Sequence, residues 1–159
     1  MFEKPKLVLG VLQRKITYID GFPRWGCFVA CILTAIQRSL GRALFAHEIQ
    51  AWFWKCVQDG CIKHNDLPVK KGSPWFRCYV CNYITAFNVG MKMFGGTRRA
   101  TAANSSHPAN VRIFRWKTPL GYHFTYGSPD KNLHDPDPRL RLLRRAGQRD
   151  MYLQNMGEV

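Results

Sequence analysis

The stretch GCFVACILTAIQRSLG, at residues 26–41, constrains the fold more than any other part of the sequence. Its apolar side chains recur at positions 28, 29, 32, 33, 36 and 40, the spacing of a helix that buries one face. Gly41 follows as a residue type that commonly ends helices. We therefore expect a helix from Cys27 to Leu40 that begins with a cysteine.

The rest of the pattern places helices before strands. Apolar spacing predicts a second helix from about Ala46 to Val57, and Ser73 with Pro74 offers an N-cap and first turn for a third helix that runs to about Phe87. Strands are expected at three later segments, VRIFRW (111–116), GYHFTYG (121–127) and RDMYLQ (149–154). The segment at 7–19 suits a short strand or an extended lead-in, and turn-forming residues dominate 20–26, 59–74, 95–110 and 128–138.

This order of elements predicts one α+β domain over residues 1–159. Its helical part is expected at about 24–95 and a small, antiparallel sheet at about 110–155. A hydrophobic content of 46% is enough for a packed core and argues against a disordered chain. The longest early apolar run, LVLGVL, is shorter than a signal peptide core and far below the ~18 residues of a membrane span. We expect a soluble, cytoplasmic protein without a membrane span.

The formal net charge is +14, from 24 Lys and Arg against 10 Asp and Glu. Such an excess attracts polyanions, so nucleic acid and acidic proteins are possible partners. The densest basic run is RLRLLRR at 139–145, and neither a helix-turn-helix signature nor an RNA-binding aromatic motif accompanies it. Charge therefore leaves open a basic, non-catalytic interaction module that binds nucleic acid or an acidic protein partner.

Cys27 has two interpretations. The turn FPRWG leads directly into the predicted helix, which places Cys27 in its first turn, where the helix dipole and unpaired amides favour a thiolate. A free cysteine in an apolar run is also a common small core residue. A nucleophilic role would further require a base, and the base would require an orienting group.

The second half of the chain offers both groups. His123 lies in the strand GYHFTYG, and Asp135 follows in HDPDP, directly before a proline. A turn between them would bring the Asp135 carboxylate beside the His123 strand, with one ring nitrogen on the carboxylate and the other toward the thiol. Taken singly, His123 suits a core position and Asp135 suits a turn. The three residues in this order are typical of nucleophilic catalysis.

A Gly-Cys pair opening an apolar helix, followed by GYHF and by Asp-Pro, resembles the papain-like cysteine peptidases. The nearest branch includes the leader-peptide-cleaving domains of bacteriocin exporters and related uncharacterised bacterial proteins. The resemblance covers residues 11–155 and implies a papain-like fold, with N-terminal helices packed on a small antiparallel sheet. It implies that Cys27 is the nucleophile, His123 the general base and acid, and Asp135 the orienting residue.

The resemblance also implies an oxyanion-hole glutamine shortly before the nucleophile. Gln13 is the only glutamine upstream of Cys27, at a gap of fourteen residues that is longer than the family's usual spacing. The expected activity is that of a thiol-dependent hydrolase or acyl transferase acting on an amide bond of a peptide or protein, without a cofactor. Its alternative is the basic interaction module, with or without structural zinc.

The other cysteines provide the zinc alternative. Cys56, Cys61, Cys78 and Cys81, with His64 between the pairs, have the outline of a zinc ribbon. Both pairs adjoin predicted helices, where Cys78 and Cys81 would share a face and pack into the core. We therefore expect buried thiols and no metal at these positions, and we expect Cys31 to be a core residue.

Overall fold

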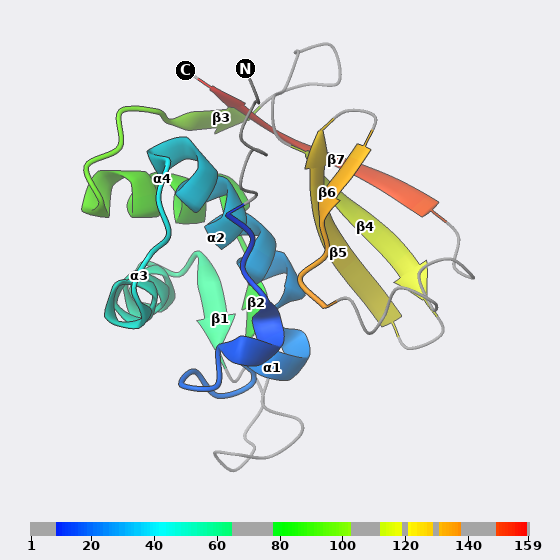
Figure 1. The fold of residues 1–159 in the computed structure, drawn as a ribbon, viewed down its shortest axis with the longest axis horizontal. Coiled ribbons are helices and arrows are strands. Elements are labelled where there is room, and N and C mark those ends of the chain that lie inside the picture. Colours follow the sequence, from blue (N-terminus) through cyan, green and yellow to red (C-terminus); the bar gives the residue numbers. More distant parts are fainter. Residues whose placement is uncertain are drawn as a thin grey trace, which may run out of the picture.

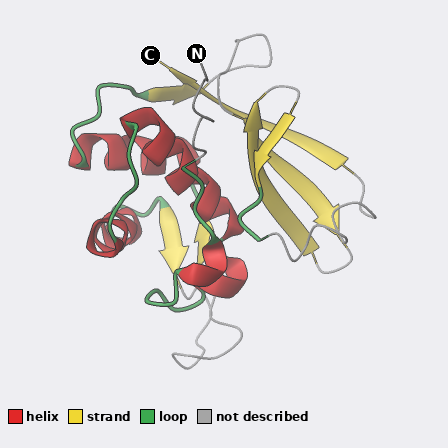
Figure 2. Ribbon diagram, in the orientation of Figure 1, coloured by secondary structure: helices red, strands yellow, loops and turns green. Residues whose placement is uncertain are grey.

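The structure, a computed structural model, describes residues 9–64, 78–102, 112–118, 121–128, 131–137 and 149–158. Helices fill the first part of the chain and strands the second (Figure 2). The helices are the 3-10 helix η1 (Gln13–Lys15), α1 (Phe22–Trp25), α2 (Cys27–Leu40), α3 (Ala46–Gln58) and α4 (Tyr83–Met93). The strands are β1 (Ile62–His64), β2 (Cys78–Val80), β3 (Ala100–Ala102), β4 (Arg112–Thr118), β5 (Gly121–Ser128), β6 (Lys131–His134) and β7 (Arg149–Glu158).

Helix α2 is the centre of the fold, between the sheet on one side and α3 and α4 on the other (Figure 1). It packs against β5 and against α4. Because it is covered on several sides, most of its side chains are buried, polar Thr34 and Gln37 included. The helix ends as the sequence predicts, because Gly41 adopts a left-handed φ of 75° and donates its N–H to the Gln37 carbonyl over 2.8 Å.

Helices α3 and α4 complete the helical layer. Trp52 is fully buried and donates its indole N–H to the Ala86 carbonyl on α4 over 2.9 Å. Gly90 faces α2 so closely that a Cβ at this position would press on the side chain of Ile36. The two contacts join α3 to α4 and α4 to α2.

The main sheet has the strand order β3-β7-β4-β5-β6, and each neighbouring pair is antiparallel. Strands β1 and β2 form a separate two-stranded antiparallel sheet. One cluster of buried apolar side chains joins both halves, since it includes Ile113 and Tyr126 from the large sheet as well as the helical core. The fold is therefore an α+β arrangement of helices packed on a small antiparallel sheet, as the sequence predicts.

Several predicted elements are confirmed at close to their expected bounds. These are the helices at 27–40 and 46–57 and the strands at 111–116, 121–127 and 149–154, observed as α2, α3, β4, β5 and β7.

The third predicted helix is wrong in its placement. Its expected start, Ser73–Pro74, lies outside the described residues, and Cys78–Val80 is a strand paired with β1. The helix begins at Tyr83 instead, because the Asn82 side chain caps it by accepting from the Thr85 N–H over 3.1 Å. Only Cys81 separates the strand β2 from this Asn cap. The local sequence pattern therefore predicted helix across both the strand and the cap.

Other short segments also differ from expectation. Residues 9–19 contain the 3-10 turn η1 and no strand, and the turn predicted at 20–26 contains α1, with Pro23 in its first turn. Strands β1, β3 and β6 lie inside stretches that we expected to be loops, at 59–74, 95–110 and 128–138. Each is only three or four residues long and depends on a partner strand elsewhere in the chain. The run RLRLLRR lies outside the described residues.

None of the helices in the described part of the chain has the length and apolar character that crossing a membrane requires.

Candidate active site

Cys27 is the first residue of α2, and its position follows from the two helices that meet there. Helix α1 ends at Gly26, whose N–H bonds to the Phe22 carbonyl over 2.8 Å and whose own carbonyl accepts from Ala30 N–H over 2.8 Å. Gly26 is needed at this junction because a Cβ would overlap the ring of Phe22. The junction leaves Cys27 in the first turn of α2 with 9% of its surface exposed.

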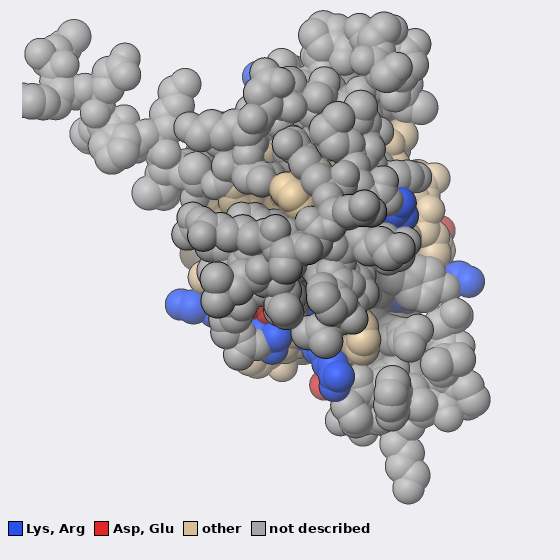
Figure 3. All heavy atoms as spheres, turned by 90° about the vertical axis from the view of Figure 1, so that its right-hand side faces the viewer, with Lys and Arg blue, Asp and Glu red and all other residues tan. Residues whose placement is uncertain are grey.

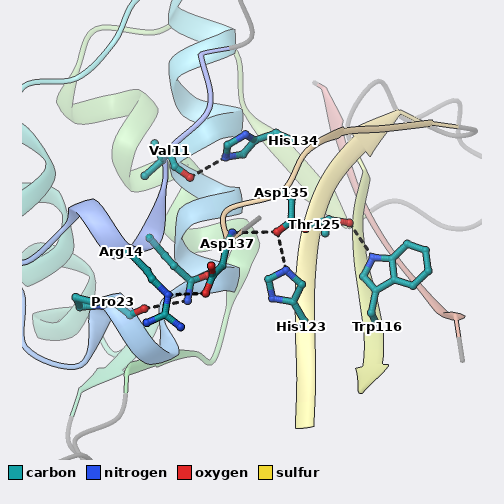
Figure 4. Close-up of polar contacts among 10 residues, drawn as sticks. Val11, Arg14, Pro23, Trp116, His123, Thr125, His134, Asp135 and Asp137 are labelled. Carbon is teal, nitrogen blue, oxygen red and sulfur yellow. Dashed lines mark hydrogen bonds and ion pairs between the residues drawn. The ribbon is translucent and has the colours of Figure 1, made fainter. Parts of the chain in front are cut away.

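His123 and Asp135 are hydrogen-bonded to one another. His123 is on β5 and is 2% exposed, and Asp135 follows the last residue of β6. Strand β6 runs antiparallel to β5, so the chain returns alongside β5 and brings Asp135 back to His123. The distance from His123 Nε2 to Asp135 Oδ1 is 2.7 Å (Figure 4). Asp137 donates its backbone N–H to the same Oδ1 over 2.9 Å, which fixes the carboxylate from a second direction.

The thiol of Cys27 is the second polar partner of the His123 ring. Burial of the ring acts to lower the pKa of His123, but hydrogen bonds to Asp135 and to Cys27, and the charges of both groups, outweigh it and raise the pKa to about 9. Because Nε2 is bonded to Asp135, Nδ1 is the nitrogen that is left for the thiol. The structure thus bonds His123 to Asp135 and brings both residues near Cys27, the three residues that the sequence singles out.

Trp116 lies beside this group on the neighbouring strand. It is directly opposite His123 in the β4–β5 register, and its indole N–H donates to the Thr125 hydroxyl over 2.8 Å (Figure 4). Directly opposed residues of an antiparallel pair share a face of the sheet. Trp116 therefore lies on the same face of the sheet as His123 and Thr125.

Gln13, the predicted oxyanion donor, lies in η1 and is buried. Its side-chain Nε2 donates to the Pro23 carbonyl in α1 over 3.2 Å. This bond brings Gln13 to the helix that precedes Cys27, although Gln13 lies fourteen residues before Cys27 in the sequence. The Gln13 backbone N–H donates to the Pro136 carbonyl over 3.0 Å, directly after Asp135. The Gln13 Oε1 atom has no hydrogen-bond partner among the described residues, although it is buried.

Two charged residues near the site were not singled out in the sequence. Arg14 donates from Nε to Asp137 Oδ2 over 2.7 Å, and Asp137 is 1% exposed (Figure 4). The signal for Asp137 was its place in the motif DPDP, two residues after Asp135. Nothing in the sequence paired it with Arg14, which lies 123 positions away.

The remaining described cysteines are separate from this group, except for Cys31. Cys31 lies one turn along α2 and is fully buried, as expected, and burial with the nearby Cys27 and Asp135 raises its pKa. Cys56 and Cys61 are also buried. The pKa of Cys56 is raised mainly by its burial and, to a smaller extent, by the nearby Cys61. Cys81 is exposed in the turn after β2, which corrects the expectation that it packs into the core from a helix.

In the described part of the chain, no three side chains of His, Cys, Asp or Glu lie together as metal ligands. The side chain of Cys78 is outside the described residues, so the four-cysteine outline is seen there only in part.

Positive charge is spread over the described surface. On the sheet side of the molecule, Lys and Arg of the described residues show at several separate places, with a few acidic side chains near them (Figure 3). Ion pairs within the described part of the chain include Arg14 with Asp137, Arg42 with Glu48 at 2.9 Å, and Lys55 with Asp59 at 3.0 Å.

The chain was compared with protein families, curated proteins and solved structures. No family model matches the sequence, and no curated protein and no solved structure matches it at a significant level.

Proposed function

We propose that this protein is a thiol-dependent hydrolase or acyl transferase of the papain-like kind, with Cys27 as nucleophile. The observation that carries the proposal is the His123 ring, which is hydrogen-bonded to Asp135 and lies near enough to Cys27 for the thiol to raise the pKa of the ring. A nucleophile, a base and an orienting carboxylate from three separate elements are the requirement for covalent catalysis by a thiol. The central helix packed on an antiparallel sheet also supports the papain-like assignment.

The residues have distinct roles in this mechanism. His123 takes the thiol proton, and the Cys27 sulfur attacks the carbonyl carbon of an amide. The carbon–nitrogen bond then breaks, and the imidazolium gives its proton to the leaving amine, which leaves a thioester on Cys27. Water or an acceptor amine, deprotonated by His123, attacks the thioester and restores the thiol. Asp135 holds the ring at the correct angle and transfers no proton.

Gln13 is the proposed donor to the oxygen that becomes negative during the attack. An amide nitrogen has two donor hydrogens, and the bond to the Pro23 carbonyl uses one of them. The second remains for the oxyanion, beside the junction that carries Cys27. A buried donor of this kind stabilises the transition state strongly because no solvent has to reorganise around it.

Labelling with a small chloroacetamide tests the nucleophile. We expect Cys27 to be labelled near neutral pH faster than Cys81, although Cys81 is the more exposed thiol, when labelled sites are mapped by mass spectrometry. In His123→Ala, labelling of Cys27 should slow about thirtyfold, because an ordinary thiol is only a few per cent thiolate near neutral pH. Labelling of Cys81 provides the internal control, since it lies away from His123.

Equal labelling of Cys27 and Cys81 in the native protein would contradict the proposal. If Cys27→Ala kept full biological function while charge reversal in 139–145 removed it, a basic interaction module would replace the enzyme.

A further inference from the structure

The segment at residues 9–14, called here the N-terminal segment, is attached to α2. Gln37 donates from Nε2 to the Leu9 carbonyl over 2.7 Å, and Val11 donates its N–H to the Thr34 hydroxyl over 3.0 Å. Both α2 side chains are buried. Buried polar side chains bonded to backbone hold a segment that has no strand or α-helix in one place. The N-terminal segment is thus fixed to the helix that begins with Cys27.

The other side of the N-terminal segment is attached to residues 134–137, which carry Asp135. His134 Nε2 bonds to the Val11 carbonyl at 2.7 Å, Gln13 N–H to the Pro136 carbonyl at 3.0 Å, and Arg14 Nε to Asp137 Oδ2 at 2.7 Å (Figure 4). The same 123 positions separate the residues of each pair, so the two segments run side by side in the same direction. A Cβ on Gly10 would overlap the His134 ring, so only glycine allows this close approach.

These contacts connect Arg14 to the His123 ring through two intermediate residues, Asp137 and Asp135. Arg14 holds the Asp137 side chain, and the Asp137 backbone N–H holds Oδ1 of Asp135, the atom that accepts from His123. The Asp137 carboxylate is 1% exposed, and a buried carboxylate that loses its cation must move toward water or take up a proton. Movement of Asp137 would withdraw its N–H from Asp135.

We propose that Arg14 and Asp137 are positioning residues, an ion pair with a buried carboxylate that sets the orientation of the Asp135 carboxylate toward His123. The proposal rests on the proposed function for the role of Asp135. The described titratable groups that act on the His123 ring are Cys27 from α2 and Asp135 after β6. Arg14 acts on the ring only through Asp135, and it is 40% exposed, so its replacement leaves the core intact.

The test is Arg14→Gln with two readouts, the midpoint of the His123 ring signals in an NMR pH titration and the rate of Cys27 labelling by chloroacetamide. In the unaltered protein the midpoint is expected near the pKa of about 9. The substitution should lower this midpoint by about one unit as the bond to Asp135 weakens. It should slow Cys27 labelling by about tenfold, the effect of one lost charge-assisted hydrogen bond.

Four further variants separate positioning from general structure. Arg42→Gln removes the same charge from an exposed pair with Glu48 and should change neither readout. Asp137→Asn keeps the size and the backbone N–H of residue 137, so it should reproduce part of the Arg14→Gln effect, and the double variant should add little to it. Arg14→Lys keeps the positive charge, so it should lower the His123 midpoint less than Arg14→Gln does.

An unchanged His123 midpoint in both Arg14→Gln and Asp137→Asn would overturn the positioning role, even if thermal stability fell. This result leaves the proposed function standing as long as Cys27 is still labelled preferentially in the unaltered protein. Absence of preferential labelling there would instead overturn the proposed function, while the NMR midpoint would still test Arg14.

Discussion

The ring of Phe28 stacks on the ring of Phe124, with 4.4 Å between centroids and 16° between planes. Phe28 follows Cys27 on α2, and Phe124 follows His123 on β5. The two residues that we expect to react are therefore each adjacent in sequence to one half of the same aromatic stack. The stack joins helix to strand at the point where the thiol must meet the imidazole.

Loosening this stack should disturb the site without unfolding the protein. We expect Phe124→Leu to lower the free energy of unfolding by about 1 kcal/mol, the value of an aromatic pair beyond its buried area. Labelling of Cys27 should slow roughly threefold, because small displacements between reacting groups are costly. Phe94→Leu is the matched control, since Phe94 is also a partly buried ring on the core but lies after α4. It should leave Cys27 labelling unchanged, and equal effects of the two variants would argue against a role for the stack.

The Asp135 carboxylate should matter through its charge as well as its position. Asp135→Asn keeps an oxygen for the His123 ring but removes the negative charge that favours the imidazolium. An NMR titration should therefore show the pKa of His123 falling from about 9 toward its ordinary value of 6.5. Cys27 labelling should fall less than in His123→Ala, because the base is still present. A His123 midpoint that stays near 9 would assign the shift to Cys27 alone.

The raised pKa of His123 also predicts how stability depends on pH. The folded protein holds this proton more tightly than the unfolded chain, since the pKa is about 9 when folded against 6.5 ordinarily. The stabilisation that the His123 proton adds to the free energy of unfolding is fully present below pH 6.5 and is lost as the pH rises from 6.5 to about 9. Urea denaturation should show the stability difference between the unaltered protein and His123→Gln shrinking over that range. A difference that grows with pH would reverse the assigned sign.

Gln13 should affect acyl transfer and leave alkylation unchanged. Chloroacetamide labelling forms no oxyanion, whereas attack on an amide or ester does. We expect Gln13→Ala to lower the rate of hydrolysis of an activated ester by about 10²–10³-fold, while Cys27 labelling by chloroacetamide remains close to that of the unaltered protein. Loss of both activities together would mean that Gln13 holds α1 in place through the Pro23 carbonyl and is not an oxyanion donor.

Two cysteines outside the site should differ in their effect on stability. Cys56 is fully buried between α3 and α4, so Cys56→Ser should lower the free energy of unfolding by about 1–3 kcal/mol through burial of a hydroxyl. Cys81 is exposed, so Cys81→Ser should change it by less than about 0.5 kcal/mol. Urea denaturation of the two variants measures both values. A large loss in Cys81→Ser alone would point to a role for this thiol that burial does not explain.

The elements whose pattern lies within one segment were predictable from the sequence. Helix α2 has its apolar spacing and its terminal Gly41 within sixteen residues, and β5 has its aromatic alternation within seven. Local spacing predicts such elements because a helix or strand that buries one face repeats its apolar residues at the period of that element. The identity of Cys27, His123 and Asp135 as candidates followed from these elements and from their order.

Elements that depend on pairing with another segment were not predictable in this way. Strand β1 pairs with β2, and β6 exists through its pairing with β5, so residues expected to be loops became strands. Arg14 and Asp137 meet across 123 positions because α2 and β6 both lie against residues 9–14. The sequence by itself determined which side chains are candidates for the chemistry and on which local elements they lie. The tertiary structure alone decided that Asp135 meets Nε2, that Gln13 reaches the turn before Cys27 and that the Arg14–Asp137 ion pair lies beside the carboxylate. The physical reason is that strand pairing and buried charge pairs gain their free energy from contacts between distant segments, which no local pattern records.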